Sequence, residues 1–362
     1  MVHITVGATP SRKLDFTKEL QLVKAAMLYA DHVTLCSLGS STMFSLSKLG
    51  DLTDDQTLDL LVQASKRNEE ESKQIEELAR AYKVIKSKKK GKRSRQELIL
   101  ERQVKSLLKK HSLDDIAQKI INDAGAQGIF TAIDSGLVEL KYLDISSKSA
   151  TTDYFELITE ILVEGGSYPL LDSLTSQLVK AAVDEGKILP LGSSLTKAKQ
   201  SGLSSELFSR LPSFDSASMD EIIDIRKELE TPLIRFRKAI INFSHDIEHM
   251  PWQDEFQHMV DQVYLEHVEP AILEIEEAYK SNKPLLDFVS KATNKPYLPT
   301  TSFIGFLISQ ANHLPHLMAQ AMSLAAGSAI IGLELMNEWK IQKAKIQKHQ
   351  LYFYHQLGKK LN

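Results

Sequence analysis

Apolar residues recur in alternating steps of four and three between positions 229 and 250, and this pattern restricts the fold more than any other. The set is Leu229, Leu233, Phe236, Ile240, Phe243, Ile247 and Met250. The spacing keeps one apolar stripe on the same side of a helix for three heptads, so that helix must pack against a partner helix. A capping box at 218–221 precedes the run. Pro232 predicts either a kink or a restart of the helix with Thr231 as its cap.

The chain that follows carries similar stripes. They consist of Trp252, Phe256, Met259 and Val263 after the break at Pro251, and of Ile272, Ile275 and Tyr279 after Pro270. Two long helices joined by a tight turn are typical of an antiparallel hairpin. Two or three more helices are expected within 301–361. Residues 218–362 are therefore predicted to form a bundle of long helices.

The N-terminal segment has a different periodicity. Short apolar runs predict strands at His3–Gly7 and His32–Cys36, and an apolar stripe predicts a helix at Asp15–Ala30 between them. A further strand is expected at 137–140. Helices are expected from Thr53 into the mid-eighties, after a capping box at 94–97, and on both sides of Gly165–Pro169 within 151–186. The predicted fold class is mainly α: a two-lobe helical protein with a small α/β, βαβ-like element at the N-terminus and a long-helix bundle in the C-terminal half.

The length of the chain predicts two lobes. With 362 residues, it exceeds the ~250–300 residues at which a single hydrophobic core stops growing. We expect an N-terminal mixed α/β and helical lobe at 1–190 and a C-terminal helical bundle at 218–362. Between them, 191–217 is rich in Ser, Leu and Gly and has weak periodicity, which is typical of a linker-like stretch.

Composition excludes several classes of protein. The apolar fraction of 43% argues against disorder, and a net charge of −3 is too small to indicate a nucleic-acid or membrane partner for the whole chain. Cys36 is the single cysteine, so no intramolecular disulfide can form, and the N-terminus has no signal-peptide pattern. We expect a soluble cytoplasmic protein. The turn Gly7–Pro10 lacks a nucleotide-binding glycine pattern, so we predict no cofactor.

One segment is strongly basic. Residues 83–110 contain twelve Lys or Arg against Glu97 and Glu101. The candidate polyanion-binding residues within it are Lys88, Lys89, Lys90, Lys92, Arg93 and Arg95. Such a cluster can track the phosphates of a nucleic acid or an anionic lipid surface, with affinity that falls steeply as salt rises. The alternative is a solvated loop that pairs with the acidic stretches 69–71 and 76–77.

The sequence Ser-His-Asp-Ile-Glu-His at 244–249 fits the metalloprotease pattern H-x-x-E-H. Its candidate metal-binding residues are His245, Glu248 and His249. A catalytic zinc requires three protein ligands that converge on one point. The helical stripe places both histidines on the flank and back of the helix, and no third ligand has a characteristic spacing. We therefore predict no metal site and keep these residues as a hydrolase-type alternative.

Residues 317–333 form an uncharged run of 17 residues. A membrane-spanning helix needs ~20 mainly apolar residues, so we predict no constitutive membrane span. The many Ala, Gly and Ser residues favour a closely packed central helix of the bundle. The alternative is a conditional membrane-associated effector that acts through this helix.

No motif in the sequence assigns a reaction, and the catalytic residues are unknown. Long helices with apolar stripes favour an interaction or regulatory protein that acts through helical surfaces, with a protein partner or as a homo-oligomer, and with polyanion contact through residues 83–110. The alternative class is an enzyme whose site is assembled from distant residues, either at the ends of the N-terminal strands or in the histidine-rich second lobe.

Overall fold

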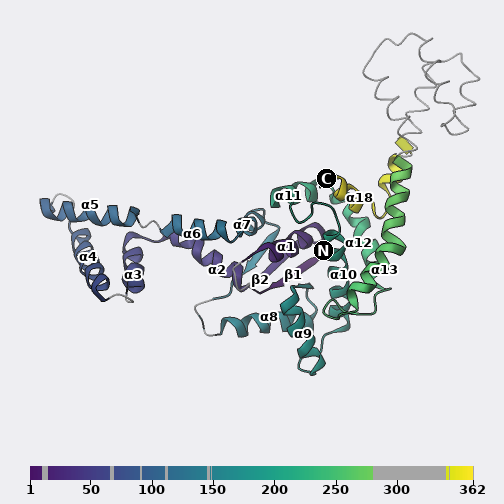
Figure 1. Ribbon diagram of the computed structural model, residues 1–362, viewed down its shortest axis with the longest axis horizontal. Coiled ribbons are helices and arrows are strands. Elements are labelled where there is room, and N and C mark those ends of the chain that lie inside the picture. The colour runs from purple at the N-terminus through teal and green to yellow at the C-terminus, as the bar shows by residue number, and fades with distance from the viewer. Residues whose placement is uncertain are drawn as a thin grey trace, which may run out of the picture. The chain divides into compact units, whose positions relative to one another are not determined.

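The computed structural model describes residues 1–9, 15–65, 69–89, 92–110, 113–144, 147, 149–279, 340–341 and 343–361. The chain divides into two compact units, residues 1–194 and 195–362. The described residues are mostly helical, and a small parallel sheet lies in the first unit (Figure 1). This confirms the predicted class, mainly α with a small α/β element at the N-terminus.

Four parallel strands form the sheet of the first unit in the order β3-β2-β1-β4. Their bounds are His3–Ala8 for β1, His32–Ser37 for β2, Val138–Lys141 for β3 and Tyr168–Leu171 for β4. His3 lies opposite His32, Ile4 opposite Tyr168, and Val33 opposite Val138. The strands expected near 3–7, 32–36 and 137–140 are therefore present.

Strand β4 is a correction to the sequence analysis, in which Gly165–Pro169 separates two helices. Within the sheet, β4 pairs with β1 only, so it is an edge strand. Pro169 lacks a backbone N–H, and an edge strand tolerates it because one side of the strand needs no partner. Proline therefore marks the edge of the sheet here and not a break between helices.

Helices of the first unit connect and flank these strands. Their bounds are Thr17–Tyr29 for α1, Leu38–Ser47 for α2, Ala150–Glu164 for α8 and Ser173–Asp184 for α9. Gly7 of β1 allows α8 to pack closely. A Cβ atom at position 7 would lie only 2.7 Å from Ile158 Cδ1 and 2.8 Å from Leu171 Cδ2.

Between β2 and β3 the chain inserts a series of helices. Their bounds are Lys48–Asp51 for the short helix η1, Asp54–Ser65 for α3, Glu69–Ser87 for α4, Arg95–Lys110 for α5, Leu113–Asp123 for α6 and Gln127–Asp134 for α7. The single helix expected from Thr53 to the mid-eighties is two helices, α3 and α4. Together with α5 they share a small core of Leu58, Ala79, Tyr82 and Val104. Those apolar residues meet because the chain reverses between α3 and α4.

The second unit is helical throughout its described part. Its elements are α10 Gly192–Ser209, which starts in the last residues of the first unit, α11 Met219–Glu228, α12 Glu230–Ser244, α13 Phe256–Val263, the π-helix η3 Tyr264–Val268, a helical continuation at 269–279, and α18 Tyr352–Lys360. The capping box at the start of α11 is present, since Ser218 Oγ accepts from the Glu221 backbone N–H and the Glu221 side chain accepts from the Ser218 N–H.

Aromatic rings form the centre of this unit. The Phe236 ring lies 5.4 Å from the Phe208 ring, 5.2 Å from Phe353 and 6.2 Å from Tyr354, measured between centroids. All four side chains are fully buried or nearly so. The core therefore joins α10, α12 and α18, although α18 lies more than a hundred residues further along the chain.

The apolar stripe of 229–250 is buried up to Ile247, but the helix that carries it is shorter than expected. A helix restarts at Glu230, with Pro232 in its first turn, and α12 ends at Ser244. Residues 245 and 246 close the helix with bonds to carbonyls three residues earlier. Ile247 stays buried because its carbonyl accepts from Lys199 Nζ at 2.7 Å, which holds the turn against α10.

The stretch 191–217, expected as linker-like, contains the helix α10, so its composition was misleading. Ser194, Ser201 and Ser204 are buried, and Ser201 Oγ donates to the Lys197 carbonyl at 3.1 Å. Helical serines can bond the preceding turn in this way, and they then occupy core positions without an apolar signal. The weak periodicity therefore reflects small polar core residues.

The stretch 317–333 lies outside the described residues. Among the helices that the structure describes, none is long and apolar enough to cross a membrane.

Candidate functional site

The carboxyl edge of the sheet gathers polar side chains from distant parts of the chain. The chain continues from β1 to β2 and β3 on one side of β1, and the later strand β4 lies on the other side. The direction in which strands are added therefore changes at β1. In open parallel sheets, ligands bind at the carboxyl ends of the strands at such a switch point. We define the switch-point cluster as Thr9, Glu19, Ser37, Ser40 and Asp172.

Asp172 joins the ends of β1 and β4. Its Oδ2 accepts from the Thr9 backbone N–H and from Thr9 Oγ1, each at 2.7 Å. Its Oδ1 accepts from the Thr175 N–H at 2.7 Å, which caps the start of α9. The Asp172 N–H donates to the Gly7 carbonyl at 2.9 Å. The carboxylate is thus held by three donors and has a defined orientation.

Glu19 lies in the first turn of α1 and is only 6% exposed. Its carboxyl group accepts from Ser37 Oγ at 2.9 Å and from Ser40 Oγ. Burial raises the pKa of Glu19 to about 7 by disfavouring the charged form; the two serine hydroxyls oppose this rise, and the negative charge of Asp172 adds to it. Glu19 therefore exchanges its proton near neutral pH.

Tyr154 of α8 extends the cluster. Its hydroxyl lies 2.7 Å from Thr175 Oγ1, on the residue that Asp172 caps. Burial, together with the charges of Asp172, Cys36 and Glu19, raises the pKa of Tyr154, so the phenol stays protonated. The edge thus combines an oriented carboxylate, a carboxyl group that titrates near pH 7 and a permanently neutral phenol.

A buried carboxyl group whose pKa is shifted toward neutrality is a common feature of sites for acid–base chemistry and for ligand recognition. Sequence reasoning named the strand ends as a possible location but missed these residues. One signal was available: Glu19 lies four positions before Val23, on the same buried face of α1. A carboxylate on a buried helical face indicates a specific role. A carboxylate in an exposed first turn does not, because the helix dipole already accounts for it.

The predicted basic residues divide into two groups. Lys88 Nζ lies 2.5 Å from Glu97 Oε1, and Arg93 lies 2.6 Å from Glu101 Oε2. Lys89, Lys92 and Arg95 are exposed, and no ion pair among the described residues involves them. Lys90 lies outside the described residues.

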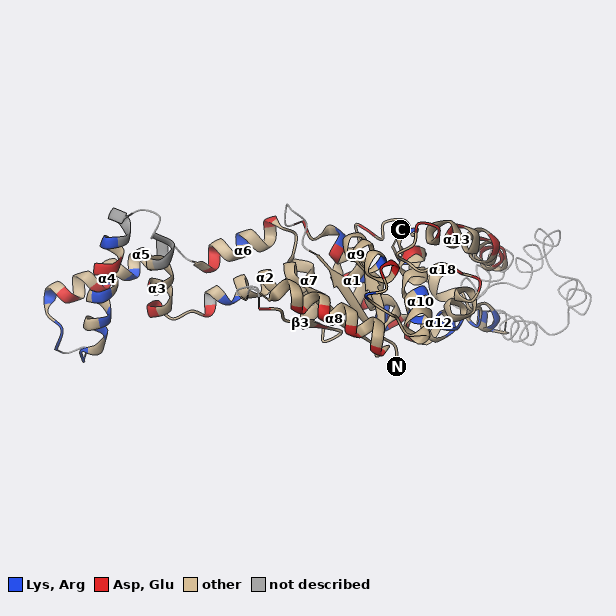
Figure 2. Cartoon of the chain, turned by 90° about the horizontal axis from the view of Figure 1, so that it is seen from below, with Lys and Arg blue, Asp and Glu red and all other residues tan. Residues whose placement is uncertain are grey.

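Much of the remaining basic charge holds the helices α3–α5 together. Lys83 pairs with Asp59 and Lys86 with Asp55, each at 2.7 Å, so α4 is tied to α3. Figure 2 shows both basic and acidic residues on α4. The acidic partners of these basic residues lie on α3 and α5, and they differ from the predicted stretches 69–71 and 76–77.

The residues of the H-x-x-E-H pattern lie after α12, in the turn that follows Ser244, and not on a continuous helix. His245 and Glu248 are exposed, and His249 Nδ1 faces Glu255 Oε2 at 3.9 Å. Among the residues that the structure describes, no three His, Cys, Asp or Glu side chains form a group that could hold a metal ion. The pattern therefore does not bring its three residues to one point.

Comparison with known proteins gives no relative: no family model matches the chain, and neither a curated protein nor a solved structure resembles it significantly.

Proposed function

We propose that this protein is a cytoplasmic regulatory interaction protein whose first unit binds a small polar ligand at the switch-point cluster. The observation that supports this is the convergence of Thr9, Glu19 and Asp172 from separate segments at the carboxyl edge of a parallel sheet. We assign to the helical surfaces the binding of a protein partner or of a second copy of this chain. Light scattering of the purified chain distinguishes these two partners.

The unused acceptor capacity of the cluster indicates the class of ligand. An ionised carboxylate has about four acceptor sites. Asp172 accepts three hydrogen bonds and Glu19 accepts two among the described residues. Asp172 therefore has about one acceptor site left, and Glu19 has about two once it ionises near neutral pH. Two nearby carboxyl groups disfavour an anion. The ligand we expect brings donors: hydroxyl groups, as in a ribose or polyol, or an ammonium group.

A ligand panel tests the proposal. We expect adenosine, glucose or spermidine to raise the melting temperature of the wild-type protein. A ligand at a hundred times its Kd adds about 2.7 kcal/mol to the free energy of unfolding. Glu19→Gln keeps the shape of the side chain but replaces one acceptor with a donor, so it should reduce the shift. Glu164→Gln, at the exposed end of α8, is the control and should respond like wild type.

Two outcomes would contradict this proposal. One is the absence of a melting shift with every member of the panel. The other is an equal shift in the wild type and Glu19→Gln, which would locate binding elsewhere.

A second function, polyanion contact, is favoured by Lys89 and Lys92 in the α4–α5 connection and Arg95 at the start of α5, which are exposed and form no ion pair among the described residues. Replacing all three with serine should lower the slope of log affinity against log salt for duplex DNA by about 2–3, since each neutralised phosphate contributes about 0.9. Fluorescence anisotropy with a labelled 20-base-pair duplex between about 50 and 200 mM salt measures this.

Lys83 and Lys86 provide the matched control for the polyanion test. Both are basic residues of the same segment, but their charges are neutralised by Asp59 and Asp55. Their replacement with serine should leave the salt slope nearly unchanged. An equal loss in both variants would mean that net charge alone, and not the α4–α5 connection, attracts DNA.

A further inference from the structure

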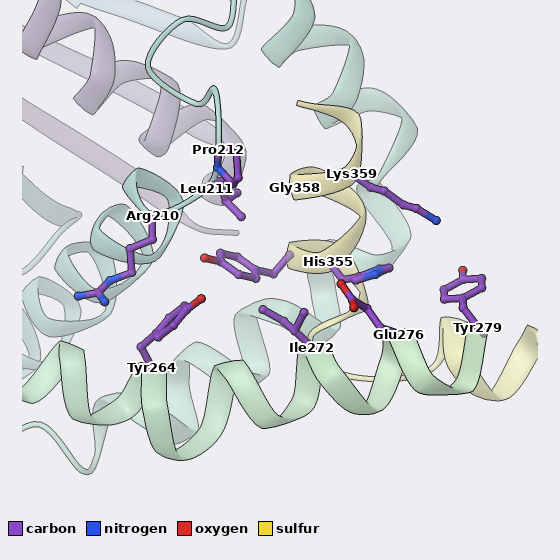
Figure 3. A pocket seen from close by; sticks show the side chains of 11 residues that line it. Arg210, Leu211, Pro212, Tyr264, Ile272, Glu276, Tyr279, His355, Gly358 and Lys359 are labelled. Atoms are coloured by element: carbon purple, nitrogen blue, oxygen red, sulfur yellow. The ribbon is translucent and has the colours of Figure 1, made fainter. Parts of the chain in front are cut away.

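A pocket of about 520 Å³ lies within the second unit (Figure 3). Three segments line it: the loop that follows α10, the helical run 264–279, and α18. Its volume falls in the range of ~300–1,000 Å³ that is typical of small-molecule sites. The polar and aromatic residues that line it are Arg210, Tyr264, Glu276, Tyr279, His355 and Lys359.

Cations and aromatic rings are paired on two sides of this pocket. The Arg210 guanidinium lies 5.0 Å from the centre of the Tyr264 ring, and Lys359 Nζ lies 5.0 Å from the centre of the Tyr279 ring. The His355 ring stacks on Tyr279 at 5.7 Å with an interplanar angle of 17°. Figure 3 shows Arg210 beside Tyr264 on one side, and His355, Glu276 and Tyr279 together on the other.

The position of Tyr264 depends on an unusual turn. The helix that begins as α13 passes through the π-helix Tyr264–Val268 before it continues to Tyr279. The wider turn keeps Val260, Val268 and Ile275 in the core, while Tyr264 still lines the pocket together with Glu276 and Tyr279. π-turns are rare and are found frequently at functional sites.

The charges of the pocket differ in how far they are neutralised. Arg210 pairs with Asp261, so its charge is compensated. Lys359 is exposed, and no ion pair among the described residues involves it. Burial and the nearby Lys359 lower the pKa of His355, and the nearby Glu276 opposes this change. Lys359 is therefore the cation available to an incoming anion.

We propose that this pocket binds a planar aromatic molecule that carries one anionic group. The rings of Tyr264 and Tyr279 supply flat apolar surface for stacking. Lys359 supplies the counter-charge. This site is separate from the switch-point cluster, which lies in the first unit.

A matched pair of probes tests the proposal. Indole-3-acetate has a planar ring, an N–H group and one carboxylate, whereas indole-3-acetamide lacks only the charge. Ligand-observed NMR titration of the full chain should show that the acid binds about tenfold more tightly than the amide, as expected for a hydrogen bond to a charged group. Lys359→Gln should abolish this preference, and Tyr264→Leu should weaken both probes.

Lys360→Gln is the control, because Lys360 is adjacent in the chain but pairs with Glu228 at 2.6 Å and does not line the pocket. It should preserve the preference for the acid. Circular dichroism verifies that each variant is folded. The proposal is overturned if neither probe binds the wild type, if acid and amide bind equally, or if Lys359→Gln retains the preference.

Discussion

Replacing Phe236 with alanine is expected to lower the free energy of unfolding by about 3–5 kcal/mol, the usual cost of removing a buried phenylalanine ring. The Phe236 side chain is 0% exposed and lies within 5.4 Å of the rings of Phe208 and Phe353. Its removal leaves a cavity at the point where α10, α12 and α18 meet. The three helices depend on this contact, because each contributes a ring to the same cluster.

Denaturant titration followed by near-ultraviolet circular dichroism measures this loss, since the aromatic cluster itself provides the signal. Ile234→Ala is the control on the same helix, because Ile234 is 67% exposed. Its effect should stay within about 0.5 kcal/mol. A loss below 1 kcal/mol for Phe236→Ala would show that the aromatic cluster is not the core of the second unit.

The stability of the protein is expected to fall by about 3 kcal/mol through Glu19 as the pH rises from 4.5 to about 7. Burial holds the pKa of Glu19 well above its ordinary value of 4.5. Between these two pH values the folded state binds more protons than the unfolded state, so stability decreases as the pH rises. The contribution is fully present below pH 4.5 and is lost once Glu19 ionises.

Glu19→Gln isolates this effect, because glutamine is uncharged at every pH. Urea titrations of wild type and variant at pH 4.5, 6 and 8 should show that wild-type stability declines relative to the variant. Ser40→Ala removes a hydroxyl that lowers the pKa of Glu19, so it should extend the decline to higher pH. The prediction is wrong if the free energy of unfolding depends on pH in the same way in the wild type and in Glu19→Gln.

Local signals predicted several helical features correctly. The stripe that includes Leu233, Phe236 and Ile240 has helical periodicity, and these side chains are buried. The capping boxes at Ser218 and Ser94 both form, since each depends on atoms within one turn. Such features are encoded within about four residues and need no knowledge of the rest of the chain.

Signals that depend on distant neighbours misled the sequence analysis. Pro169 indicated a break, yet it lies in β4, where only one side of the strand is paired. The serines of α10 indicated a linker, yet Ser194, Ser201 and Ser204 lie in the core. In both cases the residue type is compatible with two environments, and the partner elements decide between them.

The candidate sites also depend on residues that are distant in the chain. Glu19 and Asp172 are 153 positions apart, so their interaction depends on the order of the strands. The pocket of the second unit combines Arg210, Tyr264 and Lys359, which belong to three segments of the chain. No spacing in the sequence relates these residues to one another.

By itself, the sequence determined the strands β1, β2 and β3, the helix between β1 and β2, and the apolar face of α12, because periodicity and capping act over a few residues. Only the tertiary structure decided that one carboxyl group of the first helix is buried, that basic residues of α4 pair with α3, and which cations form no ion pair within the described part of the chain. The physical reason is that burial and charge pairing depend on what lies within a few ångströms in space, and chain separation does not specify that.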